Sequence, residues 1–226
     1  MEPHQYFRPL LDTFEKHSDK ENAIAMSAYM KNNFPFFGIK SENRRTIQKE
    51  FLKQHPLTNS IDTKALVNYL FAIPQREAHY AAIEMAVSRI KLIDRESIEL
   101  IEWMIINNSW WDSVDTIATK MAGKYFEKYP DEIYPHVEKW LAGNNMWLKR
   151  TALIFQLNYG IKTDAVLLFD LCTQLKGSNE FFIQKAIGWS LRQYAKKNSA
   201  SVNEFVNNTA LKPLSKREAL KHFSNE

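Results

Sequence analysis

The chain has 226 residues, is 45% hydrophobic and carries a formal net charge of +4. That length and composition suffice for a sizeable core, in one globular domain or in one continuous solenoid. The start of the chain lacks a basic-then-apolar leader, and no apolar run approaches the roughly 20 residues of a membrane-spanning helix. We therefore expect neither a signal peptide nor a membrane anchor. The single cysteine, Cys172, excludes an intramolecular disulfide and favours the reducing cytoplasm.

Helical periodicity runs along the whole chain. Apolar residues recur at helical spacing in four stretches, at 65–70, 82–90, 98–105 and 153–157. No segment alternates convincingly between apolar and polar residues, and no Asn-Gly or Asp-Gly pair indicates a hairpin. The pattern predicts an all-helical fold.

Start and stop signals divide this helical pattern. Asp62 with Thr63 and Pro130 with Asp131 predict helix starts, and Ser215 with Glu218 predicts a start with a capping box. Breaks are predicted at Pro56, Pro74 and Pro130 and near Gly177. Neither a low-complexity segment nor a linker is evident, so one domain is expected over residues 1–226.

Six positions recur at nearly regular spacing, one in each expected repeat, and we call this recurring position the phase. Their separations are 32, 37, 37, 34 and 33 residues. Five of these positions hold a small residue and one holds an acid; in chain order they are Thr46, Ala78, Asp115, Ala152, Ala186 and Ala219. Repeats of this length without strands indicate an α-solenoid of HEAT-like antiparallel helix pairs. Equivalent positions should then line up along one face.

A basic residue stands one or two positions before five of these six sites: Arg44, Arg76, Arg150, Lys185 and Arg217. Each is predicted near the start of the second helix of its repeat. Such a stripe on a concave surface suits a phosphate backbone, because arginine donates bidentate bonds and helix N-termini attract anions. The alternative is that these are ordinary solvated residues at helix starts, and the pattern leaves both interpretations open.

Asp115 replaces the small residue of the phase within the tryptophan-rich stretch SWWDSVD at 109–115. Trp111 and Asp115 are four positions apart, so they share one face of a helix. Trp189 follows a later phase position and could flank the same groove. An acid between two indole rings suits a cationic ligand. Alternatively, the tryptophans belong to the core and the aspartate caps a helix.

A nucleobase alkylated at a ring nitrogen is a cation that a basic, phosphate-binding groove could hold. Its glycosidic bond is already weakened, because the base leaves as a neutral species. One carboxylate then suffices to stabilise the oxocarbenium-like sugar and to orient or deprotonate a water. Asp115 is the carboxylate that the sequence offers for this task.

These residues resemble the AlkD-like family of bacterial DNA alkylation-repair glycosylases, which are built from HEAT-like repeats. The resemblance covers nearly the whole chain. It is carried by YMKN (29–32), FGI (37–39), SWWDSVD (109–115), WLKR (147–150), FQL (155–157), FFIQKAIGW (181–189) and LSKREA (214–219). The FGI element alone would be weak, whereas the long central and downstream motifs are specific.

The resemblance implies excision of N3- and N7-alkylated purines from duplex DNA without flipping of the base into a tight pocket. Asp115 then matches the catalytic aspartate, and Trp111 and Trp189 match the aromatic pair that frames the lesion. Arg150 matches a contact to the DNA backbone, and Tyr29 matches a further aromatic residue of the groove.

Further contacts to phosphates are expected from the basic stripe and from one neighbouring residue: Arg44, Arg76, Lys185, Arg192 and Arg217. Lys185 could in principle form a Schiff base, but it fits the stripe better, so monofunctional hydrolysis is expected. We expect no metal, because the histidines lack ligand spacing, and no nucleotide cofactor, because no phosphate-binding glycine loop occurs. The expected partner is duplex DNA bound by a monomer, with no obligate protein partner.

Two other classes of function remain open. A non-catalytic helical-repeat protein could bind damaged or branched DNA, with an affinity indifferent to loss of the Asp115 charge. A protein-binding helical scaffold would not show the steep salt dependence of a DNA-binding protein.

Overall fold

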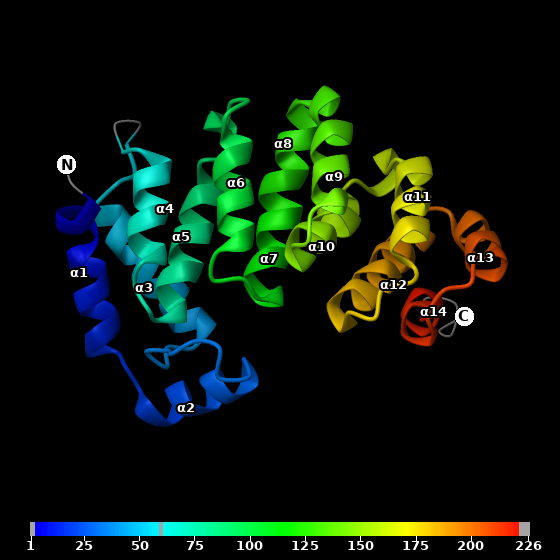
Figure 1. Cartoon of the computed structure of the whole chain (residues 1–226). Helices are drawn as coiled ribbons and strands as arrows, with labels where there is room; N and C mark the ends of the chain where they lie inside the picture. The colour runs from blue at the N-terminus through cyan, green and yellow to red at the C-terminus, as the bar shows by residue number, and fades with distance from the viewer. Residues whose placement is uncertain (1–2, 59–60, 222–226) are drawn as a thin grey trace. The chain divides into compact units, whose positions relative to one another are not determined.

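The fold is all-helical in the computed structural model, which describes residues 3–58 and 61–221 (Figure 1). No β-strand occurs within those ranges, so the predicted fold class is confirmed. By their internal contacts the residues form two compact units, Met1–Leu92 and Ile93–Glu226. The single domain over 1–226 stays a prediction.

The first unit is built around α1 (Pro3–Lys16), which packs against α3 (Ser41–Gln54) and α4 (Thr63–Phe71). In the sequence, α2 (Lys20–Tyr29) lies between α1 and α3. The next helix after α4, α5 (Arg76–Ser88), packs on α4 and is followed by a short 3₁₀ turn at Ile90–Leu92. Asp62 caps α4 as predicted, since its carboxylate accepts bonds from the backbone amides of Lys64 and Ala65.

The second unit consists of helix pairs, and it carries the residues on which the functional prediction depends. The pairs are α6 (Ser97–Ile106) with α7 (Trp111–Ile117), α9 (Ile133–Ala142) with α10 (Met146–Ile154), α11 (Ala165–Leu175) with α12 (Phe181–Ala195), and α13 (Ser199–Asn208) with α14 (Pro213–Leu220). A π-helical turn at Ala118–Ala122 and α8 (Gly123–Lys128) continue α7, and 3₁₀ turns occur at Pro130–Glu132, Phe155–Asn158 and Gly160–Lys162.

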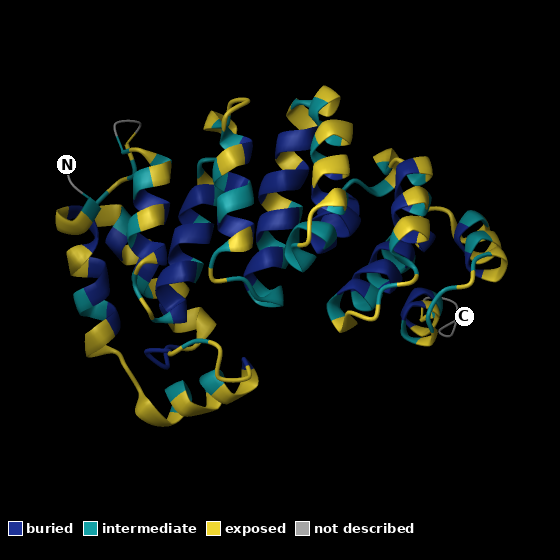
Figure 2. Ribbon diagram, in the orientation of Figure 1, coloured by how far each residue is buried: buried dark blue, intermediate teal, exposed yellow. Residues whose placement is uncertain are grey.

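The second helices of these pairs also pack on one another within the unit. α10 contacts both α7 and α12, and α12 contacts α14. Figure 2 shows buried residues on the facing sides of these helices. Packing between neighbouring pairs is the arrangement of a helical solenoid.

The recurring position is buried in four of the six repeats and partly buried in a fifth. Ala78, Ala152, Ala186 and Ala219 are at most 1% exposed, and Asp115 is half-buried. Thr46 is the exception, because it is exposed while Arg44 and Gln48 face the interior of the first unit. The phase therefore slips in the first repeat.

The capping box predicted at Ser215 and Glu218 is wrong. Pro213 takes the first position of α14, where its fixed φ angle and missing amide hydrogen are well tolerated. Ser215 is inside the helix and donates its hydroxyl hydrogen bond to the carbonyl of Gln184. Glu218 is instead surrounded by basic side chains.

A buried carboxylate fastens the segment between α2 and α3. Glu77 is fully buried on α5, and its oxygens accept bonds from the backbone amides of Phe37, Gly38 and Ile39 at 3.0, 2.9 and 3.0 Å. Gly38 has a φ of +90°, and a Cβ there would lie 2.0 Å from the carbonyl oxygen of Asp19. Only glycine fits this turn.

Replacement of Gly38 by alanine is therefore expected to destabilise the fold. Gly38→Ala should lower the free energy of unfolding by about 2 kcal/mol or more, from backbone strain and the clash with Asp19. Gly177→Ala is the control, because a Cβ at Gly177 meets nothing within 4 Å. Urea unfolding of both variants checks this, and an equal, small effect would contradict it.

Candidate active site

The candidate site starts at the turn that leads into α7. Asn108 adopts a φ of +48°, a left-handed conformation that asparagine tolerates, and the hydroxyl of Ser109 donates to the carbonyl of Ile105 at 2.6 Å. Trp111 and Asp115 follow on α7, and both are partly exposed. A π-helical turn begins three residues after Asp115, a feature frequent at functional sites.

Asp115 forms a bidentate ion pair with Arg150 of α10. The Nε of Arg150 lies 2.7 Å from Oδ1, and Nη2 lies 2.8 Å from Oδ2. Nη1 donates to the carbonyl oxygen of Phe182, at the start of α12, at 2.6 Å. The side chains of Asp115 and Arg150 are 18% and 5% exposed. Arg150 thus joins α7, α10 and α12 through one guanidinium.

The surroundings of Asp115 make it an unusually basic carboxylate. Burial raises its pKa above the ordinary 3.8, and the negative charge of Asp112 adds to that rise. The bonds and charge of Arg150 oppose the rise without cancelling it. A carboxylate that is poorly hydrated and more basic than usual interacts strongly with a nearby cation or water proton.

Three aromatic rings pack together beside this ion pair. The ring of Phe182 lies 5.1 Å from that of Trp110 and 5.1 Å from that of Trp147, and the two tryptophans are 5.8 Å apart. The rings come from the start of α7, α10 and α12, so they fix the same three helices that Arg150 joins. Sequence reasoning gave Trp147 and Phe182 no role, although both stand in the motifs that contain Arg150 and Trp189.

Trp189 lies on α12, two turns beyond Phe182, and is partly exposed. Its neighbour Gly188 faces α14, where an added Cβ would lie 2.3 Å from the Cβ of Glu218 and 2.8 Å from the carbonyl of Ser215. In the second unit Trp111 and Asp115 lie on α7, Arg150 lies on α10 and Trp189 lies on α12, and α10 contacts both of the other helices.

The basic residues of the predicted stripe differ in their exposure. All five lie in the first two turns of their helices, as predicted. Arg44, however, is 3% exposed and gives bonds of 3.0 and 2.6 Å to the carboxylate of Glu84. Arg76 is fully buried, with its guanidinium 3.9 Å from the ring centre of Phe34.

Burial corrects the expectation of phosphate contacts for these two arginines, since their guanidinium groups face protein partners. Arg150 is equally buried, so its main partner in this structure is Asp115 rather than an exposed anion. Lys185 and Arg192 are partly exposed beside Glu218, and Arg217 is exposed. Tyr29, at the end of α2 in the first unit, is 68% exposed.

Comparison with known proteins identifies the family. A family model described as "DNA alkylation repair enzyme" matches residues 10–223. The chain belongs to this DNA alkylation repair enzyme family. A search of curated proteins found no match.

The chain is also similar to a solved structure. That structure is described as a predicted DNA alkylation repair enzyme from Enterococcus faecalis, and it is 33% identical with a TM-score of 0.84. The match covers 92% of this chain and 98% of that one.

Neither a metal site nor a membrane span is found in the described part of the chain. Within residues 3–58 and 61–221, no group of three or more His, Cys, Asp or Glu side chains could hold a metal ion. No helix of those residues is long and apolar enough to cross a bilayer.

Replacement of Arg150 should destabilise the fold, because the buried charge of Asp115 would lose its partner. Arg150→Ala leaves the carboxylate largely buried without its ion pair, so we expect the free energy of unfolding to fall by about 3–5 kcal/mol in urea titrations. Adding Asp115→Asn to this variant should restore part of the loss, because the stranded charge is then gone. Equal stability of the single and double variants would contradict this coupling.

Proposed function

We propose that this member of the family is a monofunctional DNA glycosylase. It hydrolyses the N-glycosidic bond of cationic N3- and N7-alkylated purines, such as 3-methyladenine and 7-methylguanine, in duplex DNA. The observation that carries this proposal is the largely buried carboxylate of Asp115. It is paired with Arg150 of α10 and lies on the same face of α7 as Trp111. The family's description as a repair enzyme supports a catalytic role.

Asp115 would act on the sugar and on water. As the bond to the alkylated base lengthens, the base becomes neutral and positive charge moves to the deoxyribose. A fixed carboxylate in a poorly hydrated site stabilises that charge and accepts a proton from the attacking water. No general acid is needed, because the leaving base requires no proton.

Trp111 and Trp189 would frame the lesion-bearing nucleotide through cation–π attraction. Lys185, Arg192 and Arg217 are the exposed or partly exposed basic residues that would contact the backbone, with Tyr29 as a further aromatic contact. A cavity of about 260 Å³ in the second unit is lined by residues such as Gln156 and Tyr194, and by none of the proposed catalytic residues.

The protein would act as a monomer on the bacterial nucleoid. Its HEAT-like repeats would form a concave basic groove for the DNA. The protein would start base excision repair by leaving an abasic site. Bulky cationic adducts would also be substrates, because recognition without a tight pocket would not limit the size of the base.

A second candidate function is non-catalytic binding of damaged or branched DNA. The observation in its favour is the complete bidentate pairing of Asp115 with Arg150, which a purely structural carboxylate would also make. The two functions differ in their response to removal of the Asp115 charge.

Asp115→Asn is expected to abolish most base release while leaving DNA binding intact. Asparagine keeps the size of the side chain but loses the charge that stabilises the transition state, so the single-turnover rate should fall by about 100-fold or more. The measurement is release of 7-methylguanine from a duplex with one lesion, at matched DNA occupancy.

Asp112→Asn provides the matched control for this loss. It removes the same charge from the same helix and should retain base release. Equal rates for wild type and Asp115→Asn would overturn the catalytic role of Asp115. Binding without release by the wild type, on 7-methylguanine and 3-methyladenine duplexes, would favour the second function.

The two aspartates also predict a pH dependence. Base release needs ionised Asp115, so the rate should fall as pH drops through the pKa of Asp115, which lies above the usual 3.8. Asp112 raises that pKa, so Asp112→Asn should lower it and move the acidic limb to lower pH. Single-turnover rates across the acidic range check this, and a limb that stays or moves upward would contradict it.

A further inference from the structure

A second buried carboxylate, Glu218 on α14, forms ion pairs with three basic side chains. Its oxygens lie 3.1 Å from Lys185 Nζ, 3.0 Å from Arg192 Nη1 and 2.6 Å from Lys221 Nζ. Arg192 Nη1 also donates to the backbone carbonyl of Glu218 at 3.1 Å. Burial alone would raise the pKa of Glu218, but the bonds from these bases outweigh it and lower the pKa to about 2.

This cluster adjoins Trp189. Lys185 and Arg192 lie four positions before and three positions after it, so all three side chains share one face of α12. The missing side chain of Gly188 lets α14 approach closely enough for Glu218 to reach that face.

The cluster has an inner acid and an outer layer of bases. The side chain of Glu218 is 4% exposed, whereas those of Lys185, Arg192 and Lys221 are 36%, 27% and 51% exposed. Three positive charges meet one negative charge, so a surplus of positive charge faces the solvent. Each lysine ammonium has three hydrogen-bond donors, more than its bond to Glu218 requires.

We propose that Glu218 is a positioning residue, which holds Lys185, Arg192 and Lys221 as one preformed site for a backbone phosphate next to Trp189. This role rests on the proposed DNA glycosylase function and deepens it. Long basic side chains lose rotamer freedom when they bind a phosphate, and prior fixation by Glu218 lowers that cost.

Charge alone predicts the opposite effect for a Glu218 variant. Glu218→Gln raises the net charge from +4 to +5, which by general electrostatics strengthens binding to a polyanion. Loss of positioning weakens binding, because the three bases are no longer held together. The sign of the change therefore distinguishes the two effects.

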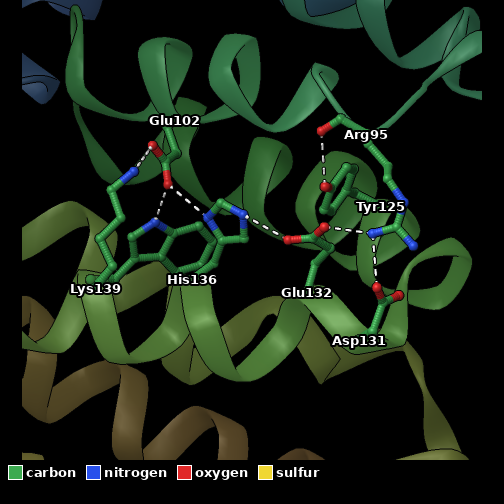
Figure 3. Close-up of polar contacts among 8 residues, drawn as sticks. Arg95, Glu102, Tyr125, Asp131, Glu132, His136 and Lys139 are labelled. Carbon is green, nitrogen blue, oxygen red and sulfur yellow. Dashed lines mark hydrogen bonds and ion pairs between the residues drawn. The ribbon is translucent and has the colours of Figure 1, made fainter.

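Glu102 offers a matched control in the same unit, between α6 and α9 (Figure 3). It also accepts bonds from three side chains, Lys139, Trp140 and His136, and its side chain is 17% exposed. Glu102→Gln removes the same charge and disturbs a comparable network. It leaves Lys185, Arg192 and Lys221 in place.

The test is the affinity for an undamaged duplex, measured by fluorescence anisotropy over a series of salt concentrations. Glu218→Gln should bind about 10-fold more weakly, with a salt slope smaller in magnitude by about 0.9, which is the contribution of one phosphate contact. Glu102→Gln should bind as tightly as wild type or more tightly. Tighter binding by Glu218→Gln with an unchanged slope would overturn the positioning role.

A surface variant covers the case in which Glu218→Gln does not fold. Lys221→Gln should weaken binding and reduce the slope by about 0.9. Lys124→Gln, at a lysine that is 53% exposed and paired with Glu127, should change neither. Equal effects of the two lysine variants would overturn the site. Because undamaged DNA is used, failure of base release would leave these results unaffected.

Discussion

The ion pair between Asp115 and Arg150 is the interaction on which the second unit depends. It places a negative charge among α7, α10 and α12 with little solvent around it, at N–O distances of 2.7 and 2.8 Å. Burying a carboxylate is costly unless a cation and hydrogen bonds compensate. Arg150 supplies both and also binds the carbonyl of Phe182. The fold thereby keeps a poorly hydrated carboxylate with a raised pKa on the same helix as Trp111, which is the condition that the proposed hydrolysis requires.

Much of the fold could be predicted from the sequence, because local rules determine it. Helical spacing and helix breaks are properties of short segments. The predicted breaks at Pro56, Pro74 and Pro130 all fall between α-helices of the structure. The Asp62 cap follows from its own side chain in the same way. The recurring alanines are buried in the later repeats, because a small residue at that position lets neighbouring helices approach. The family followed from motifs that contain these same positions.

The partners of the charged residues could not be predicted, because each partner lies in a neighbouring repeat rather than in the same segment of sequence. Arg44 binds Glu84, Arg150 binds Asp115, and Lys185 and Arg192 bind Glu218, across 26 to 40 positions of sequence. From the sequence, the regularly spaced basic residues predict a solvent-exposed stripe. In the structure three of them, Arg44, Arg76 and Arg150, are buried. The capping box at Ser215 failed for a similar reason, since Pro213 started the helix earlier and Glu218 found partners on α12. The aromatic contacts of Trp110, Trp147 and Phe182 likewise appear only when three helices meet.

The most direct test of carboxylate-assisted glycosylase chemistry is the mass of both products. A duplex with a single 7-methylguanine would be incubated with the wild-type protein, and the strand and the released small molecule would be weighed by mass spectrometry against an enzyme-free control. We expect free 7-methylguanine and a strand that has lost one base while all of its phosphodiester bonds stay intact. A strand that keeps the base without its methyl group would contradict it, as would a strand that is bound but unchanged beyond the control.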